Sequence, residues 1–159
     1  MRILGLDPGT SLIGYGIIDT DKKSYTPVDF GFLKTGVNIM NRDRVREVYD
    51  FFDKLIKKFK PDKVSLESLF FFKNAKTVIK VSEVRGVLMV VAANNGIEIT
   101  EFTPLQVKQA VSGYGRAEKN QVQKMVKMIL GLETEPKPDD TADALALAIC
   151  CANTVVYEN

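Results

Sequence analysis

The sequence has 159 residues, 45% of them hydrophobic and 26% charged, which is typical of a soluble globular protein and predicts one domain spanning residues 1–159. It contains no histidine, which excludes Ser-His-Asp triads, imidazole bases and His-ligated zinc. The net charge is only +2, and setting acids aside for a metal site would leave a basic excess suited to a phosphate backbone. The only cysteines, Cys150 and Cys151, are adjacent, which favours small core residues in a reducing, cytoplasmic compartment. We expect no membrane span and no signal peptide.

The first sixteen residues predict a β-hairpin that carries one acid. An apolar run from Ile3 to Leu6 leads into Asp7 and a Pro8-Gly9 turn, and a second apolar run from Leu12 to Ile18 returns. An acid at the end of a buried strand can coordinate a metal or position a phosphate. The alternative interpretation is an aspartate that only forms the turn before Pro8-Gly9.

A third strand and a helix follow the hairpin. Residues 25–35 alternate loosely, which predicts a strand antiparallel to the second. Residues 42–59 place their apolar side chains on one face of a helix, for which Asn41 is the expected N-cap and Lys60-Pro61 the end.

The next strand, residues 62–68, repeats the opening pattern because it too finishes in an acid, Glu67. A strand that follows a helix is expected to join the sheet parallel to the first strand. Two neighbouring parallel strands would bring Asp7 and Glu67 to the same edge of the sheet. This pairing favours the functional interpretation of Asp7.

A group of aromatic and basic residues lies directly after Glu67 and is predicted to contact DNA. Its members are Phe70, Phe71, Phe72, Lys73 and Lys76. Two of the three rings are expected to belong to the core, and at least one is expected to stack on an exposed base, a contact worth roughly 1–3 kcal/mol. Which of the three does so is left open. The long helix predicted over residues 75–94 is rich in β-branched residues, which suits burial on more than one face, as in a dimer interface.

The third quarter of the chain predicts a strand over residues 97–102 and two helices. Thr103 is the expected N-cap of the first helix, which runs to Val111, and the second spans residues 118–130. The glycine-rich loop between them carries Arg116. Lysines and this arginine outnumber acids here, as a phosphate backbone would require: Lys108, Arg116, Lys119, Lys124 and Lys127.

The last predicted helix begins near Pro138 and carries two acids in its first turns. Asp140 and Asp143 are three residues apart and therefore share a face, where they repel each other unless a cation lies between them. A second face consists mainly of small residues and should let the helix lie close to a sheet: Ala142, Leu145, Ala146 and Ile149.

Four acids from three separate elements thus form a candidate cluster: Asp7, Glu67, Asp140 and Asp143. Four carboxylates without histidine or cysteine suit two magnesium ions about 3.5–4 Å apart, where one activates a water and the other stabilises the leaving oxygen. The matching reaction is phosphodiester hydrolysis.

With these motifs, the sequence resembles the RuvC-type Holliday-junction resolvases (crossover junction endodeoxyribonucleases) of the ribonuclease H-like superfamily. The matching segments are Gly-Leu-Asp7-Pro-Gly-Thr, Glu67, Gln106-Val-Lys-Gln109, Ala117-Glu-Lys119 and Asp140-x-x-Asp143-Ala-Leu-Ala. They follow the family's order and spacing over nearly the whole chain.

The resemblance implies an α/β, ribonuclease H-like fold with a five-stranded mixed sheet flanked by helices. It implies a magnesium-dependent homodimer that makes paired symmetric nicks in a four-way DNA junction, leaving 5′-phosphate and 3′-hydroxyl ends. Two Mg²⁺ ions, for which Mn²⁺ is able to substitute, would be bound by Asp7, Glu67, Asp140 and Asp143. Lys108 and Lys119 would lie near the scissile phosphate, and Phe70 would contact bases at the crossover. A branch-migration motor of the RuvA/RuvB type is the implied partner.

Other interpretations were weighed against this one. The Asp-x-Gly-Thr opening also resembles the phosphate-binding hairpin of the actin and sugar-kinase superfamily, whose enzymes need two such domains and a second phosphate loop that 159 residues cannot hold. A different ribonuclease H-like nuclease, for instance one that acts on RNA hybrids, is a nearer alternative. A non-catalytic junction-binding protein is a third, but it would not need all four acids.

Overall fold

The computed structural model describes the whole chain except residues 22, 37–38, 69–74 and 158–159. Its centre is a five-stranded mixed sheet in the order β3-β2-β1-β4-β5. The strands are β1 (Arg2–Pro8), β2 (Leu12–Thr20), β3 (Tyr25–Lys34), β4 (Lys63–Glu67) and β5 (Glu98–Phe102). The first three are antiparallel neighbours, whereas β4 and β5 run parallel to β1. The predicted strands and the predicted mixed sheet are therefore confirmed.

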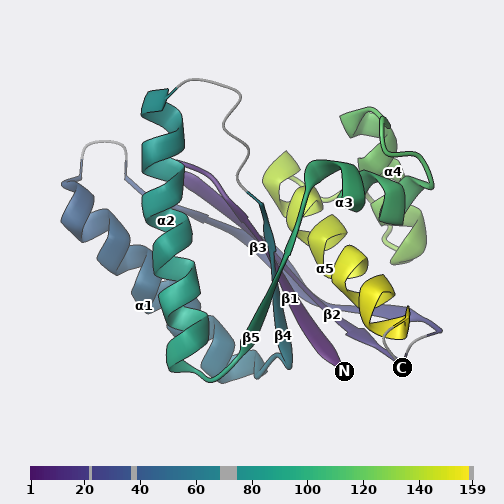
Figure 1. Cartoon of the computed structure of the whole chain (residues 1–159), viewed down its shortest axis with the longest axis horizontal. Coiled ribbons are helices and arrows are strands. Elements are labelled where there is room, and N and C mark those ends of the chain that lie inside the picture. The colour runs from purple at the N-terminus through teal and green to yellow at the C-terminus, as the bar shows by residue number, and fades with distance from the viewer. Residues whose placement is uncertain (22, 37–38, 69–74, 158–159) are drawn as a thin grey trace.

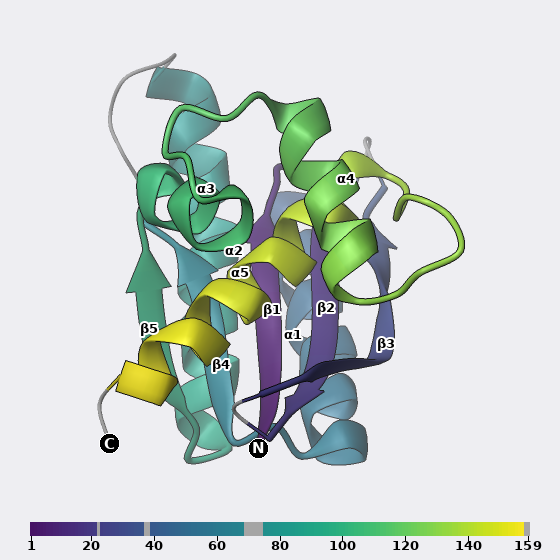
Figure 2. The same ribbon diagram turned by 90° about the vertical axis from the view of Figure 1, so that its right-hand side faces the viewer.

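Helices cover both faces of this sheet (Figures 1 and 2). One face carries α1 (Asn41–Phe59) and α2 (Ala75–Asn94), and the other carries α3 (Pro104–Ser112), α4 (Lys119–Ile129) and α5 (Asp139–Tyr157). No helix in the described part of the chain is long and apolar enough to cross a membrane.

The ends of two helices show which capping predictions hold. α3 begins with the predicted cap, because the Thr103 hydroxyl accepts from the backbone N–H of Gln106 while the Gln106 side chain accepts from the N–H of Thr103. The prediction for α1 was wrong: Met40 holds the N-cap position without a side-chain bond. The amide of Asn41 instead donates to Glu83 of α2 at 2.9 Å, so Asn41 links two helices.

Parallel pairing places the carboxyl ends of β1 and β4 at one edge of the sheet. Leu6 pairs with Leu66, and the next residue of each strand is an acid, Asp7 and Glu67. The sheet register therefore brings the two predicted acids side by side, as expected from the order of helix and strand.

Glycines in β1 and β2 let α5 lie directly on the sheet. A Cβ built on Gly5 would lie 2.0 Å from the carbonyl oxygen of Ala144, and one on Gly14 would lie 2.0 Å from that of Asp140. Both distances are far below any real contact, so only glycine fits. The predicted close approach is confirmed, but Ala144, outside the predicted small-residue face, makes the nearest contact to Gly5.

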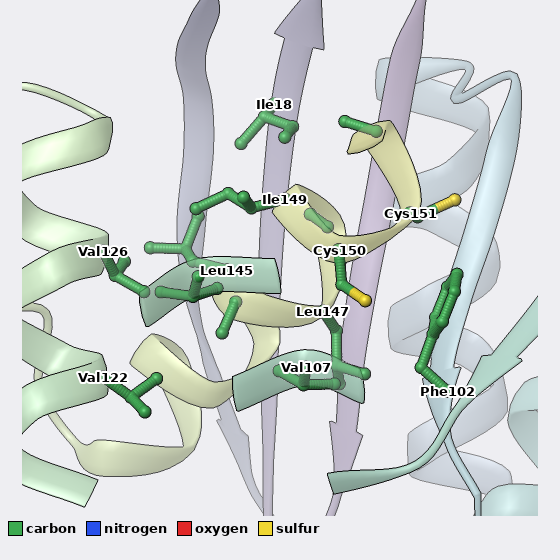
Figure 3. Close-up of a cluster of buried hydrophobic side chains, with 14 of the residues drawn as sticks. Ile18, Phe102, Val107, Val122, Val126, Leu145, Leu147, Ile149, Cys150 and Cys151 are labelled. Atoms are coloured by element: carbon green, nitrogen blue, oxygen red, sulfur yellow. The ribbon is translucent and has the colours of Figure 1, made fainter. Parts of the chain in front are cut away.

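Two hydrophobic clusters, one on each side of the sheet, hold these layers together. Figure 3 shows the cluster around α5, in which Leu145 and Ile149 meet Val122 and Val126 of α4 and Val107 of α3. Burying each such side chain stabilises the fold by about 1.5–3 kcal/mol. α3 and α4 are thereby fixed above α5, close to the edge that carries the acids.

Candidate active site

A cavity of about 210 Å³ opens where the carboxyl ends of β1 and β4 meet α3, α4 and α5. Five residues predicted for the site line it: Asp7, Glu67, Lys108, Lys119 and Asp143. Each comes from a different element, so the tertiary fold alone brings them together. The rest of the wall consists mainly of apolar side chains from α3, α4 and α5.

Burial and mutual repulsion act on the three cavity acids in the same direction. Burial, followed by the charges of Asp143, Glu67 and Asp140, raises the pKa of Asp7 to about 8. Burial also raises the pKa of Glu67 and of Asp143. Full ionisation of this group therefore costs free energy, and a cation in the cavity would offset that cost.

Lys119, the first residue of α4, provides part of the missing positive charge. Its Nζ lies 3.0 Å from Asp143 Oδ2 and 3.6 Å from Asp139 Oδ2. Burial lowers the pKa of Lys119, but the hydrogen bond and charge of Asp143 outweigh it, so the pKa is raised and the amine stays protonated. Lys119 and Lys108 both lower the pKa of Glu67, although less than burial raises it.

Asp140, the fourth predicted acid, is not among the residues that line the cavity. Its Oδ1 would lie 3.7 Å from a Cβ built on Gly9, which places it beside the β1–β2 turn. It still acts on the site, because its charge contributes to the raised pKa of Asp7. The structure thus places three of the four acids on the cavity wall and the fourth next to the turn.

The chemistry of these side chains fits a hard divalent cation. Carboxylate oxygens are the ligands that Mg²⁺ prefers, and a cation would favour the ionised form of Asp7, whose pKa is raised by burial and by the neighbouring acids. Among the described residues, no group of three or more acidic or cysteine side chains is arranged to hold an ion as it stands. The acids would have to draw inward around a bound ion.

Only some of the residues predicted to contact DNA belong to the described part of the chain. Phe70, Phe71, Phe72 and Lys73 lie outside the described residues, and Lys76 belongs to the first turn of α2. Arg116 is exposed in the loop between α3 and α4, close in sequence to Lys119.

Two residues near the site were missed from the sequence. Asp139 directly precedes Asp140 and contacts Lys119, so the same run of acids could have indicated it. Arg85 of α2 reaches the backbone carbonyl of Glu67 from the other face of the sheet. It lies between Val84 and Gly86 in a helix predicted to be buried, where nothing in the sequence singles it out.

Comparison with known proteins gives one consistent family. The sequence model described as crossover junction endodeoxyribonuclease RuvC matches residues 3–151. A protein of that name from Fusobacterium nucleatum subsp. nucleatum is 50% identical over 155 residues, which cover 98% of this chain and 82% of the relative.

Two solved structures have the same architecture. The RuvC structure from Thermus thermophilus superposes with a TM-score of 0.92 at 31% identity, covering 99% of this chain and 97% of that one. The Thermus thermophilus RuvC in complex with a Holliday junction substrate gives a TM-score of 0.90 at 29% identity, covering 98% and 95%.

Proposed function

We propose, since the chain belongs to the crossover junction endodeoxyribonuclease RuvC family, that its acid-lined cavity hydrolyses phosphodiester bonds in DNA. The chain has the ribonuclease H-like fold of that family and is an endodeoxyribonuclease that resolves four-way (Holliday) DNA junctions. We further propose that residues 1–159 act as one nuclease domain, that cleavage occurs as paired symmetric nicks leaving 5′-phosphate and 3′-hydroxyl ends, and that the enzyme works in the cytoplasm.

The observation that carries the assignment of the site is the juxtaposition of Asp7 and Glu67 on neighbouring parallel strands, opposite Asp143 and two lysines. Asp7, Glu67, Asp140 and Asp143 would hold two Mg²⁺ ions, or Mn²⁺ in their place. When bound, these ions supply activation of the attacking water and stabilisation of the leaving oxygen. The carboxylates bind and orient, while the apolar part of the wall limits access of bulk water.

The lysines are proposed to act on the scissile phosphate. Lys108 lines the cavity from α3, and Lys119 places its amine next to Asp143. Their charges would bind the phosphate and offset the charge that develops on its oxygens. Arg116, Lys73 and Lys76 would bind the DNA backbone, and Phe70 or Phe71 would stack on bases at the crossover.

Paired nicks require two cavities, and we propose a homodimer that supplies them. α2 supports this proposal, because Ile79 and Val90 are 61% and 52% exposed on its outer side. A branch-migration motor of the RuvA/RuvB type is proposed as a further partner on the grounds of the family.

The test is cleavage of a synthetic four-way junction in Mg²⁺ by the wild type and by Asp7→Asn. We expect Asp7→Asn to lower the cleavage rate by roughly 10³-fold and to retain junction binding, because it alters the cavity and not the outer basic surface. Asp19→Asn, an acid of the same sheet at its opposite end, is the matched control and should cleave within about twofold of wild type. Equal cleavage of linear duplex, or full cleavage in the presence of a chelator, would disprove the proposal.

A further inference from the structure

Arg85 of α2 connects three elements behind the cavity. Its Nη2 lies 2.5 Å from Glu101 Oε2 of β5, its Nε donates to the backbone carbonyl of Glu67 at 3.4 Å, and its Nη1 contacts Met89 Sδ at 3.3 Å. The Arg85 side chain is only 13% exposed. α2 lies on the face of the sheet opposite α5 (Figure 1), so these contacts reach Glu67 from behind the cavity.

We propose that Arg85 is a positioning residue for catalysis, which together with Glu101 fixes the end of β4 so that the Glu67 carboxylate stays beside Asp7. This inference rests on the proposed function, in which Glu67 binds the catalytic metal. Arg85 touches neither substrate nor metal and acts only through the backbone of Glu67.

The end of β4 needs such support because of where Glu67 sits. β4 has five residues, and Glu67 is the last of them. One further backbone bond, from the N–H of Ser68 to the carbonyl of Phe102, continues the pairing with β5. Strand ends open more readily than strand centres, since fewer bonds hold them. A ligand at this position is therefore only as well placed as the strand end that carries it.

The charges in the cavity act to displace Glu67. Asp143 repels it across the cavity, and it in turn repels Asp7. A displacement of Glu67 away from these acids would relieve the repulsion but weaken a shared metal site. The contact from Arg85 restrains the backbone of Glu67 against that displacement.

The shape of arginine explains why this residue type suits the task. A guanidinium presents five donors in a rigid planar fork, so one side chain can bind a carboxylate and a carbonyl of two different strands at once. A lysine at position 85 would keep the ion pair with Glu101 but would lack the second, fixed donor toward Glu67. Arg85→Lys therefore removes the contact to the backbone of Glu67 while leaving the charge balance behind the sheet intact.

The same two strands offer a matched control at their other ends. Lys63 Nζ lies 3.1 Å from Glu98 Oε2, which joins the first residue of β4 to the first residue of β5. Glu98→Gln and Glu101→Gln thus make the same change in the same strand, three residues apart. Only Glu101 belongs to the end that carries Glu67.

The experiment measures Mn²⁺ binding to the DNA-free protein by calorimetry, thermal unfolding, and the Mg²⁺ concentration for half-maximal junction cleavage. We expect Arg85→Lys and Glu101→Gln to weaken Mn²⁺ binding by about 10-fold and to raise the Mg²⁺ requirement in parallel. Junction binding should stay within about twofold of wild type, since the basic surface is unchanged. Glu98→Gln should match wild type in all of these measurements.

Wild-type Mn²⁺ affinity in Arg85→Lys, or equal weakening by Glu98→Gln, would overturn the inference. Should Arg85→Lys fail to fold, the comparison of Glu101→Gln with Glu98→Gln decides in its place. Glu67→Gln separates the two proposals. If it leaves Mn²⁺ binding and cleavage intact, the site assignment fails; if it abolishes both while Arg85→Lys behaves as wild type, only the role of Arg85 fails.

Discussion

Charged side chains are paired at one end of the central sheet and only partly compensated at the other. At the amino end of β1, Arg2 binds Asp19 through two bonds of 2.8 Å and also donates to the carbonyl of Phe59. At the carboxyl end, Asp7 faces other acids and only part of a compensating charge from Lys119. The hydrogen bond from Arg2 lowers the pKa of Asp19, whereas burial raises the pKa of Asp7 to about 8.

Cavity size does not identify this site, because two depressions of about 660 and 800 Å³ elsewhere on the described structure are larger. The amino end carries a depression of about 660 Å³ that includes Arg2, Asp19 and Asp62, which is larger than the cavity of about 210 Å³ that holds Asp7. Arg2 and Asp19 of the larger cavity form an ion pair, whereas the acids of the smaller one repel one another and would be stabilised by a cation. Uncompensated charge is thus the better guide to the proposed catalytic site.

The largest expected effect concerns the stability of the metal-free protein as pH changes. A folded-state pKa raised to about 8 means that folded Asp7 holds its proton more tightly than the unfolded chain does. Its contribution is therefore most favourable below the unfolded pKa near 4 and is lost as pH rises toward 8, by roughly 3–5 kcal/mol. Urea unfolding in chelator from pH 5 to 8.5 measures this loss.

Asp7→Asn is the comparison for this dependence of stability on pH. The variant should lose less stability over the same pH range, and it should be more stable than wild type at pH 8, because the buried charge is gone. Mg²⁺ should stabilise the wild type more than the variant. Identical pH slopes in wild type and variant would show that the carboxylates are well compensated, and the contrast between the two ends would fail.

The next effect in size concerns Lys119. Lys119→Ala should lower single-turnover cleavage by about 10²-fold, because it removes the cation that lies 3.0 Å from Asp143 Oδ2. Lys124→Ala, on the exposed side of the same helix, is the control and should change only the salt dependence of binding. A similar modest loss in both variants would reduce Lys119 to general surface charge.

The smallest effect is expected at the amino end. Asp19→Asn should destabilise the fold by only about 0.5–1 kcal/mol, because the Arg2–Asp19 pair is partly exposed to solvent and screened by it. Denaturant midpoints at pH 7 measure the change. Since the ion pair holds the pKa of Asp19 down, its contribution should be present above the unfolded pKa near 4 and vanish in more acidic solution.

Local patterns in the sequence predicted most of the sheet and most of the site. Asp7 and Glu67 could be identified because each ends an apolar strand, and the helix before β4 indicated parallel pairing. The predicted N-cap of α1 was wrong, and Asn41 instead donates to Glu83 of another helix, a tertiary contact without a local signal. Arg85 was missed for the same reason, since its partners lie on two strands distant in sequence.

The position of Asp140 could be predicted only in part from the sequence. Helical spacing correctly placed it on the same side of α5 as Asp143, but spacing does not say how far each side chain reaches along the sheet. That distance depends on how α5 is seated, which only the packed structure defines.

The seating of α5 on glycine has a consequence for how this enzyme can change. Gly14 is the antiparallel partner of Asp7, and the backbone of Asp140 rests on it. One methyl group at position 14 would lift the start of α5 and draw its acids away from Asp7. The span of the proposed metal site is thus determined at a position that has no side chain and takes no part in the chemistry. A substitution at Gly14 would therefore be as damaging to the reaction as the loss of a proposed metal ligand.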